Sequence, residues 1–115
     1  MGNPSSDGDD YVEVVLSLVE RIPWGRATTY GDLAEVVRER TGTGGPRQVG
    51  RVLSMHGGGV PWWRVVRADG RLPAHNEDAA RQNHLAEGTA MLGPERVDLR
   101  TAGWDPHDSD SPNRP

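Results

Sequence analysis

Residues 46–56, PRQVGRVLSMH, constrain the fold most strongly, because they carry two different faces at the spacing of a helix. The apolar face recurs at i, i+3, i+4 and i+7, and its members are Val49, Val52, Leu53 and His56. The opposite face has the same spacing, and its members are Arg47, Gly50, Arg51 and Ser54. Pro46 suits the first position of this helix, because it donates no backbone hydrogen bond. We expect one face to pack in a core and the other to be presented.

A second helical pattern lies just before this segment, at residues 30–40. Thr29 and Asp32 have the spacing of a helix N-cap and its N3 partner, and the flexible connection TGTGG follows the helix. Two helices joined by a short glycine-bearing turn, the second short and arginine-faced, form a helix-turn-helix pattern. Gly50 costs a helix about 1 kcal/mol relative to alanine, which indicates a close approach to the backbone there. Two core helices with a solvated charged face would show the same pattern.

The segment VPWWRVV, residues 60–66, is rich in β-branched and aromatic residues. Asp69-Gly70 follows it and favours a tight turn, so we predict a strand that leads into a hairpin. Neighbouring side chains of a strand face opposite ways, so Trp62 and Trp63 are not expected on the same side.

The rest of the chain completes one small domain that is mainly helical. Helices are predicted at residues 10–21 and 77–87, and short strands near Met91 and at residues 97–99. Asn76 is expected to cap the helix at 77–87 and Gly88 to end it. Its inward side chains are Ala80, His84 and Leu85 or neighbouring alanines, and Trp104 closes the core. Residues 1–9 and 105–115 are acidic and too polar to pack, so we predict disordered tails around a domain at residues 10–104.

The charge distribution favours a nucleic-acid partner, although the formal net charge is −4. Residues 40–75 hold six arginines and only one acidic residue, Asp69. Phosphate binding normally requires such a concentration of basic side chains.

Several kinds of chemistry are excluded by what the sequence lacks. The chain has no cysteine, which rules out disulfides, a thiolate nucleophile and a zinc site built on sulfur. The four histidines show no metal-binding spacing, so we expect neither a metal nor a cofactor. No apolar run has the length of a membrane span, and the N-terminus does not resemble a signal sequence. We therefore expect a cytoplasmic monomer, located at the nucleoid when bound to DNA.

The order and spacing of five motifs resemble a known family. The motifs are IPWGRATTYGDLA, PRQVGRVL, PWWRVV, DGRL and HLAEG. Together they are similar to the DNA-binding domain of O6-alkylguanine-DNA alkyltransferases, a winged helix-turn-helix fold, over about residues 11–104. Reactive members carry a cysteine, which accepts the alkyl group, where this chain has Trp62. The chain is therefore most similar to the alkyltransferase-like proteins, which bind alkylated guanine without repairing it and flag it for nucleotide excision repair.

The resemblance implies two sets of site residues. DNA binding and nucleotide flipping would involve Tyr30, Arg47, Gly50, Arg51 and Ser54. The lesion pocket would involve Pro61, Trp62, Arg64, Val65, Leu72 and His75. Arg47 would fill the vacated stack from the minor groove, Tyr30 would turn the 3′ phosphate, and Trp62 would contact the alkyl group. Residues 72–75 would form a lid, and Arg51, Ser54 and Arg64 would position the backbone or pair locally.

Plainer interpretations of three of these residues stay open. Tyr30 could be an ordinary first-turn helix residue with an exposed hydroxyl. Arg47 could be merely solvated, and Trp62 could be a core residue.

The resemblance also implies a protein without enzyme activity. Reactive relatives polarise the thiol with a following histidine and a distant glutamate; this chain retains Glu87 but has Trp63 at the histidine position. A buried indole N–H normally seeks an acceptor. We therefore expect the Trp63 indole to donate to the Glu87 carboxylate, in a structural role behind the pocket.

Two alternative functions remain open at this point. A winged-helix transcriptional regulator would read base edges in the major groove, and an alkyltransferase-type enzyme would act through His75 or Glu87. The small, arginine-bearing face of residues 46–56 suits insertion into the minor groove better than base reading in the major groove. No nucleophile, oriented base and oxyanion site are assembled in the sequence.

Overall fold

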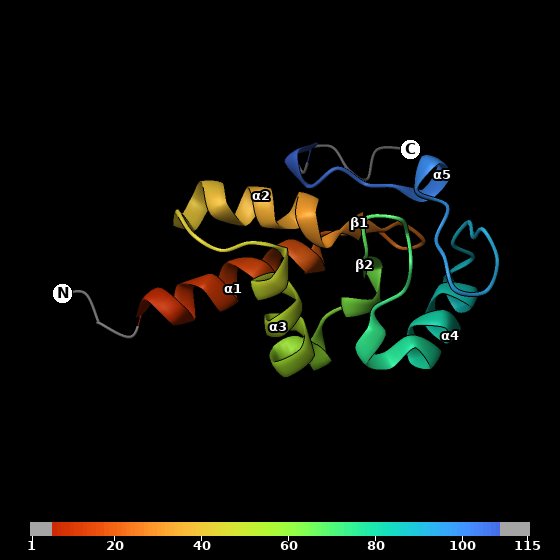
Figure 1. Ribbon diagram of the computed structural model, residues 1–115, viewed down its shortest axis with the longest axis horizontal. Coiled ribbons are helices and arrows are strands. Elements are labelled where there is room, and N and C mark those ends of the chain that lie inside the picture. Colours follow the sequence, from red (N-terminus) through yellow and green to blue (C-terminus); the bar gives the residue numbers. More distant parts are fainter. Residues whose placement is uncertain (1–5, 109–115) are drawn as a thin grey trace.

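The computed structural model describes residues 6–108, with side chains from residue 10 to residue 107, and it is mostly helical (Figure 1). Its main helices are α1 (Ser6–Glu20), α2 (Tyr30–Thr41), α3 (Pro46–His56), α4 (Glu77–Glu87) and the short α5 (Leu99–Ala102). The described residues also form four 3-10 turns, η1 (Gly57–Gly59), η2 (Trp62–Arg64), η3 (Ala74–Asn76) and, after α5, η4 (Pro106–Asp108). Two strands, β1 (Thr28–Thr29) and β2 (Val65–Val66), form a small sheet. The predicted, mainly helical fold class is confirmed.

The helices α2 and α3 begin where the sequence predicts. The Thr29 hydroxyl accepts a hydrogen bond of 3.0 Å from the Asp32 N–H, which satisfies a free donor of the first turn of α2. The Gln48 side chain accepts one of 3.0 Å from the Gly45 N–H, and Pro46 occupies the first turn of α3. These local contacts fix the first turn of each helix.

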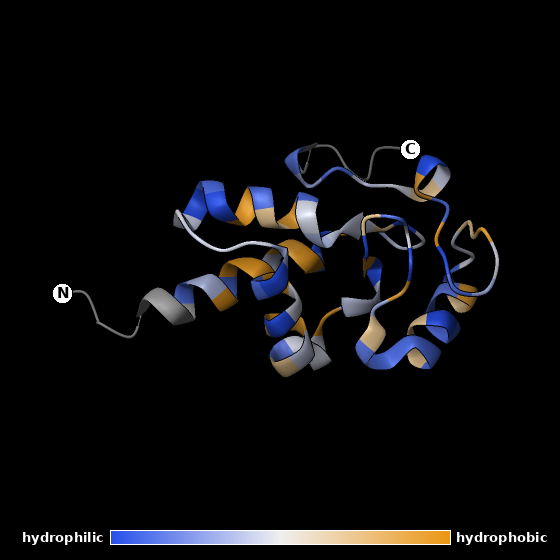
Figure 2. Ribbon diagram, in the orientation of Figure 1, coloured by the Kyte–Doolittle hydropathy of each residue, from blue (hydrophilic) through white to orange (hydrophobic). Residues whose placement is uncertain are grey.

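The larger apolar core lies among α1, α2 and α3. Val15, Leu18, Leu33, Val37 and Val49 are fully buried there, and each buried aliphatic side chain contributes about 1.5–3 kcal/mol of transfer free energy. Figure 2 shows the apolar segments of α1 and α2, whereas α4 is largely hydrophilic. The predicted packed face of α3 is confirmed for its valines and leucine. His56 is exposed instead, because α3 ends at this residue and Gly57 follows as its C-cap.

The predicted strand at residues 60–66 forms only at Val65 and Val66, and the predicted hairpin is wrong. The segment first coils, with the Trp62 N–H donating to Val60 O at 2.7 Å and the Arg64 N–H donating to Pro61 O at 3.0 Å. Only Val65 and Val66 are extended, and they pair in parallel with Thr28 and Thr29. A parallel partner cannot be joined by a tight turn, and here the connection between the two strands contains α2 and α3.

The predicted tight turn at Asp69-Gly70 is confirmed, although it does not join two strands of one hairpin. The Gly70 N–H donates to Arg67 O at 2.8 Å, and Gly70 has a φ of +93°. A side chain at Gly70 would also collide with the carbonyl oxygen of Val97. This position therefore requires glycine both for its backbone angle and for its packing.

The C-terminal half agrees with the predictions in part. Helix α4 has the predicted bounds, Gly88 ends it, and Ala80 and His84 are buried. Asn76 precedes α4 but makes no capping bond with its side chain. Leu85 is exposed rather than inward.

The predicted short strands are reduced to one contact. Met91 and Val97 form a single antiparallel bridge, and Leu99 begins helix α5 because the Asp98 side chain caps its first turn. Trp104 is buried, as predicted for the residue that closes the core.

The predicted domain boundaries are only partly covered by the described residues. Helix α1 begins at Ser6, four residues before the predicted start, so part of the expected disordered N-terminus is helical. At the other end, η4 (Pro106–Asp108) lies within the expected disordered C-terminal tail, so this part of the prediction is also wrong. Residues 1–5 and 109–115, which hold the remainder of both predicted tails, lie outside the described residues. Within residues 6–108, no helix is both long and apolar enough to cross a membrane.

Candidate nucleic-acid interface

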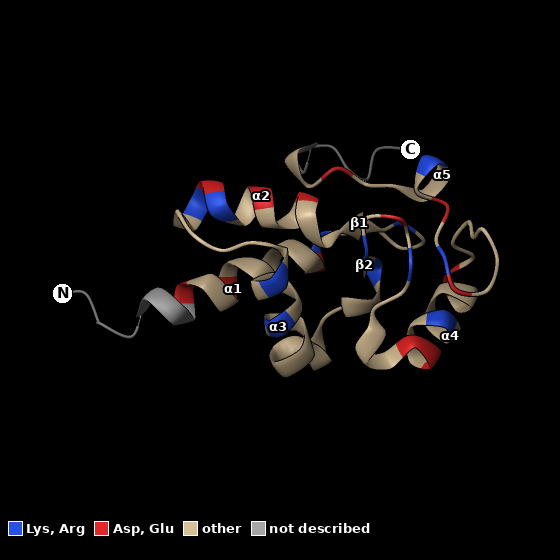
Figure 3. Ribbon diagram, in the orientation of Figure 1, with Lys and Arg blue, Asp and Glu red and all other residues tan. Residues whose placement is uncertain are grey.

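The outer face of α3 is presented to solvent as the sequence predicts. Arg47, Arg51 and Ser54 are exposed. Within the described part of the chain, neither arginine has a carboxylate within ion-pair distance. Figure 3 shows basic but no acidic positions on α3, whereas α2 carries several acidic ones. The face is therefore a free, positively charged surface on a short helix.

Gly50 lies on this face beside the ring of Tyr30. A Cβ built at Gly50 would be 3.8 Å from Tyr30 Cε1, which is an ordinary van der Waals distance. The fold itself therefore has room for alanine here. The packing of the protein therefore does not require glycine at this position, and a requirement for it would have to come from a binding partner.

Tyr30 keeps its hydroxyl protonated at any physiological pH. Partial burial raises the pKa of Tyr30 to about 12, because the phenolate loses hydration there, while the charge of Arg67 lowers it in part. The side chain packs against the three-helix core from the first turn of α2. Tyr30 thus offers a neutral hydrogen-bond donor at the edge of the α3 face.

Arg67 belongs to this surface, although it is not among the site residues predicted from the sequence. It is exposed, and it follows Val66, whose strand partner Thr29 directly precedes Tyr30. The local excess of arginine between residues 40 and 75 includes Arg67 but does not distinguish it. The missing signal was the parallel pairing of β1 with β2, because sequence periodicity favoured a hairpin instead.

Trp62 and Trp63 meet each other at the junction of two apolar clusters. Their rings are 5.7 Å apart and nearly perpendicular, at 85°. Trp62 contacts both clusters, whereas Trp63 packs on the smaller one around Val66, Leu72 and Ala80. The predicted separation of the two rings onto opposite sides of a strand is wrong, because the backbone at this point is a 3-10 turn.

The predicted lesion pocket is only partly assembled. His75 lies with its ring 5.4 Å from that of Trp62 and tilted by 45°, so these two predicted pocket residues do meet. Val65 and Leu72 are fully buried core residues and cannot line a surface pocket in this conformation. A shallow hollow of about 390 Å³ opens beside Pro61, but it is lined by Trp24, Trp63 and Arg64 rather than Trp62.

Arg64 is buried and pairs locally. It is 8 % exposed, and its Nη2 lies 2.7 Å from Glu87 Oε2. Its Nη1 donates to the carbonyl oxygen of Ile22 at 2.8 Å. The guanidinium carbon lies over the rings of both Trp24 and Trp63, at 5.5 and 5.6 Å from their centroids. Of the two roles expected for Arg64, local pairing is the one observed.

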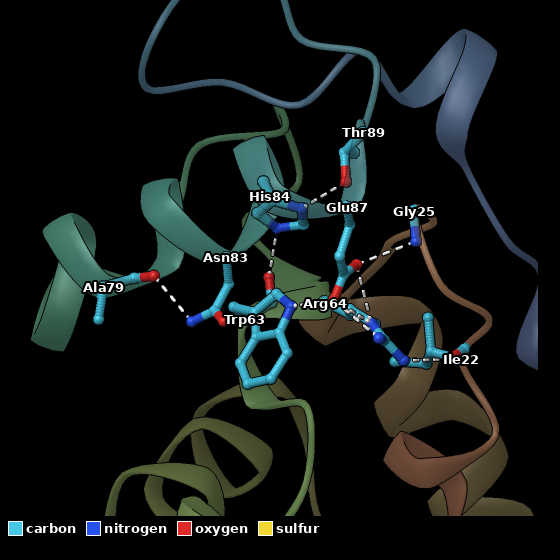
Figure 4. Close-up of polar contacts among 9 residues, drawn as sticks. All are labelled: Ile22, Gly25, Trp63, Arg64, Ala79, Asn83, His84, Glu87 and Thr89. Atoms are coloured by element: carbon cyan, nitrogen blue, oxygen red, sulfur yellow. Dashed lines mark hydrogen bonds and ion pairs between the residues drawn. The ribbon is translucent and has the colours of Figure 1, made fainter.

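The expected bond between Trp63 and Glu87 is present (Figure 4). Trp63 Nε1 donates to Glu87 Oε2 at 2.8 Å, and the Gly25 N–H donates to Oε1 at 2.9 Å. Burial alone would raise the pKa of Glu87, but the hydrogen bonds from Arg64, Gly25 and Trp63 outweigh it and hold the pKa below its usual value. Glu87 is therefore an ionised structural anchor.

His84 holds the backbone of the same turn. Its Nε2 lies 2.7 Å from the Trp63 carbonyl oxygen and its Nδ1 lies 2.9 Å from the Thr89 hydroxyl (Figure 4). A carbonyl can only accept, so Nε2 carries the proton and Nδ1 accepts from Thr89. Burial lowers the pKa of His84 and outweighs the opposite effect of its bond to Trp63. Trp63 is therefore fixed through both its side chain and its main chain.

Comparison with known proteins matches this arrangement to one family. Residues 10–90 match the family described as 6-O-methylguanine DNA methyltransferase, DNA binding domain. The chain is 37% identical over 103 residues to a DNA base-flipping protein of Escherichia coli (strain K12), covering 84% of this chain and 75% of that protein. It is 28% identical over 102 residues to a DNA base-flipping protein of Vibrio parahaemolyticus, covering 85% of this chain and 99% of that protein.

A solved structure supports the same assignment. The crystal structure of S. pombe Atl1 in complex with damaged DNA containing O6-carboxymethylguanine superposes with a TM-score of 0.70 at 26% identity, over 84% of this chain and 95% of that one. The resemblance inferred from the sequence motifs is thereby confirmed. The chain belongs to the family of the 6-O-methylguanine DNA methyltransferase DNA-binding domain, as an alkyltransferase-like member.

Proposed function

We propose that this protein binds double-stranded DNA containing O6-alkylguanine, rotates the damaged nucleotide out of the duplex and leaves its alkyl group in place. The observation that supports this most is the exposed face of α3, where Gly50 lies beside Tyr30 and where Arg47 and Arg51 have no ion-pair partner among the described residues. The names of the bacterial relatives and the DNA lesion in the S. pombe complex point the same way.

The α3 face is suited to the minor groove. Rotating a nucleotide out of the stack costs a few kcal/mol, and side chains inserted between bases compensate for the lost stacking. Arg47 stands in the first turn of α3 and is free to take that position. Gly50 adds no side chain where the helix would approach the groove floor, and the Tyr30 hydroxyl would donate to a backbone phosphate.

Trp62 would form the wall that meets the alkylated base. Its indole is only partly buried, and His75 covers part of it. For a purine to reach Trp62, the exposed His75 ring has to move aside with the loop that precedes α4. An apolar indole gains about 0.8 kcal/mol for each further CH₂ that it buries, so larger alkyl groups would be tolerated.

Alkyl transfer is not expected at this site. Transfer requires a soft, ionisable nucleophile, which an indole cannot provide. Glu87 is fully engaged by Trp63, Arg64 and Gly25, so this carboxylate is not free to activate a nucleophile. A protein that binds a lesion without consuming it would mark the site, and we propose that nucleotide excision repair proteins act on the marked DNA.

The test is an equilibrium titration with two duplexes that differ only in one O6-methyl group. We expect the protein to bind the methylated duplex at least tenfold more tightly, about 1.4 kcal/mol, as measured by fluorescence anisotropy. Equal affinity for the two duplexes would refute lesion recognition. Affinity that depends on the flanking sequence rather than on the methyl group would favour a transcriptional regulator.

A further inference from the structure

Tyr30 and Arg67 emerge side by side from the same end of the small parallel sheet. In β1 and β2, Thr28 pairs with Val65 and Thr29 pairs with Val66. The next residues along the chain are Tyr30, the first residue of α2, and Arg67, and neighbouring strands are about 4.8 Å apart. The register therefore places the backbones of Tyr30 and Arg67 next to each other at the point where both strands end.

The backbone of Arg67 is held in place by the following turn. Its N–H donates to Arg71 O at 2.9 Å, and its carbonyl accepts from the Gly70 N–H at 2.8 Å. The side chain is exposed, and among residues 10–107 it has no carboxylate within ion-pair distance. The nearby acid, Asp69, is paired with Arg71 at 3.4 Å. Arg67 thus presents an exposed cationic side chain from a backbone that hydrogen bonds hold in place.

Tyr30 is equally fixed and chemically complementary. Its ring rests beside Gly50 of α3, and its hydroxyl stays neutral, so it donates a hydrogen bond without adding charge. The charge of Arg67 lowers the pKa of Tyr30 in part, as a cation on this side of the phenol would. A neutral O–H donor and a cation at one place suit a monoanionic phosphodiester, which needs one charge partner and further donors.

We propose that Arg67 and Tyr30 together clamp one phosphate of the damaged strand. This inference rests on the proposed function and adds a binding residue that the motifs did not indicate. The clamp would lie across Tyr30 from the α3 arginines, so the strand would be held on one side while Arg47 enters the stack on the other. Arg67 would then fix the register of the damaged strand, because phosphate contacts position a protein on DNA without reading its sequence.

The experiment compares Arg67→Gln with a charge-matched control, Arg81→Gln. Arg81 is ion-paired with Asp78 at 2.6 Å on α4, away from the proposed clamp. Binding to the methylated duplex is titrated over a series of salt concentrations. We expect Arg67→Gln to bind about tenfold more weakly at low salt and to reduce the slope of log K against log salt by about 0.9, the value for one lost phosphate contact. Arg81→Gln should match the wild type in both.

A scan of single methylphosphonate substitutions in the damaged strand then locates the phosphate. At one position, the neutral linkage should weaken DNA binding by the wild type and by Arg81→Gln but not by Arg67→Gln. At the same position, it should weaken binding by Tyr30→Phe less than binding by the wild type. In free Arg67→Gln, the NMR titration of Tyr30 should show a higher pKa than in the wild type. An unchanged salt slope, or methylphosphonate penalties that Arg67→Gln retains at every linkage, would overturn the clamp.

The clamp and the proposed function fail in different ways. If the wild type binds methylated and unmethylated duplexes equally, lesion recognition is refuted, and the same scan on undamaged DNA still tests the clamp. If the wild type prefers the lesion but Arg67→Gln behaves like Arg81→Gln, the clamp is refuted and lesion recognition stands.

Discussion

The Trp63 indole donates a hydrogen bond of 2.8 Å to Glu87, whose other oxygen accepts from the Gly25 main chain at 2.9 Å. Trp63 therefore satisfies a buried carboxylate that would otherwise need another donor. The carboxylate also pairs with Arg64, which joins η2 to α4 and to the end of α1. An anchor of this kind holds the neighbouring Trp62 in place and has no proton to exchange.

Trp62→Cys should not restore alkyl transfer. The new thiol would lack the histidine and glutamate pair that polarises it in reactive relatives, because Trp63 stands at the histidine position and donates to Glu87. We expect no methyl group on the protein after incubation with O6-methylguanine DNA, measured by intact-protein mass spectrometry. The combined variant Trp62→Cys with Trp63→His is the matched comparison, and methylation of the single variant at the same rate would contradict this explanation.

Glu87→Gln should destabilise the protein by about 3–5 kcal/mol, because it leaves the buried Arg64 guanidinium without its counter-charge. The pKa of Glu87 is lowered by folding, so its stabilisation is present above its usual pKa of about 4.5 and is lost as the pH falls through the folded value. Urea unfolding at pH 7 and near pH 3 measures both effects. The difference between wild type and variant should shrink at the lower pH, and a constant difference would contradict the ionised anchor.

His84→Gln should remove a pH dependence of the free energy of unfolding between pH 5 and pH 7. Burial lowers the pKa of His84, so the unfolded chain binds a proton more readily than the folded protein does. Wild-type stability should therefore be complete above about pH 6.5 and fall below it, by at most about 1.4 kcal/mol per pH unit. The pKa of the exposed His107 is raised, mainly by its bond to Asp105. Its contribution to stability therefore changes with pH in the opposite direction to that of His84. Comparing the unfolding free energies of wild type and variant from pH 5 to pH 7 isolates His84.

Gly50→Ala should affect folding and DNA binding in opposite directions. The added methyl group meets the Tyr30 ring at an ordinary contact distance, so the gain in helix propensity of about 0.5–1 kcal/mol should raise stability. The same methyl group would hold α3 away from the groove floor and weaken binding. Thermal unfolding and anisotropy on one preparation test both signs. A variant that binds DNA as well as the wild type would show that no partner approaches Gly50.

Arg47→Ala should weaken binding to the methylated duplex by about 1–3 kcal/mol, as expected for the loss of a close DNA contact. Stability should not change, because the Arg47 side chain is exposed and has no ion-pair partner among the described residues. Arg40→Ala, at the end of α2, is a control that removes the same charge. If both variants weakened DNA binding equally, Arg47 would contribute only its charge and not a specific contact.

The helices could be predicted from the sequence because their signals are local. Thr29 with Asp32, Pro46 and Gly88 mark helix ends through contacts within a few residues. The contact between Trp63 and Glu87 was also predictable, because a buried indole N–H needs an acceptor and the motif order supplied one.

The pairing of the strand at Val65–Val66 could not be predicted, because its partner is remote. Val65 pairs with Thr28, and no periodicity within the segment reveals a parallel neighbour beyond two intervening helices. For the same reason, the sequence did not indicate that Arg67 lies near Tyr30. The burial of Arg64 depended on Glu87 and Ile22, which come from two other parts of the fold.

The central claim, recognition without chemistry, is tested most directly by following a tritiated O6-methyl group through binding. Protein and labelled duplex are mixed at saturating concentration, the complex is isolated on a native gel, and the complex is then denatured. We expect a lesion-dependent complex from which all tritium is recovered with the DNA. Tritium on the protein, or the absence of a complex that requires the methyl group, would contradict it.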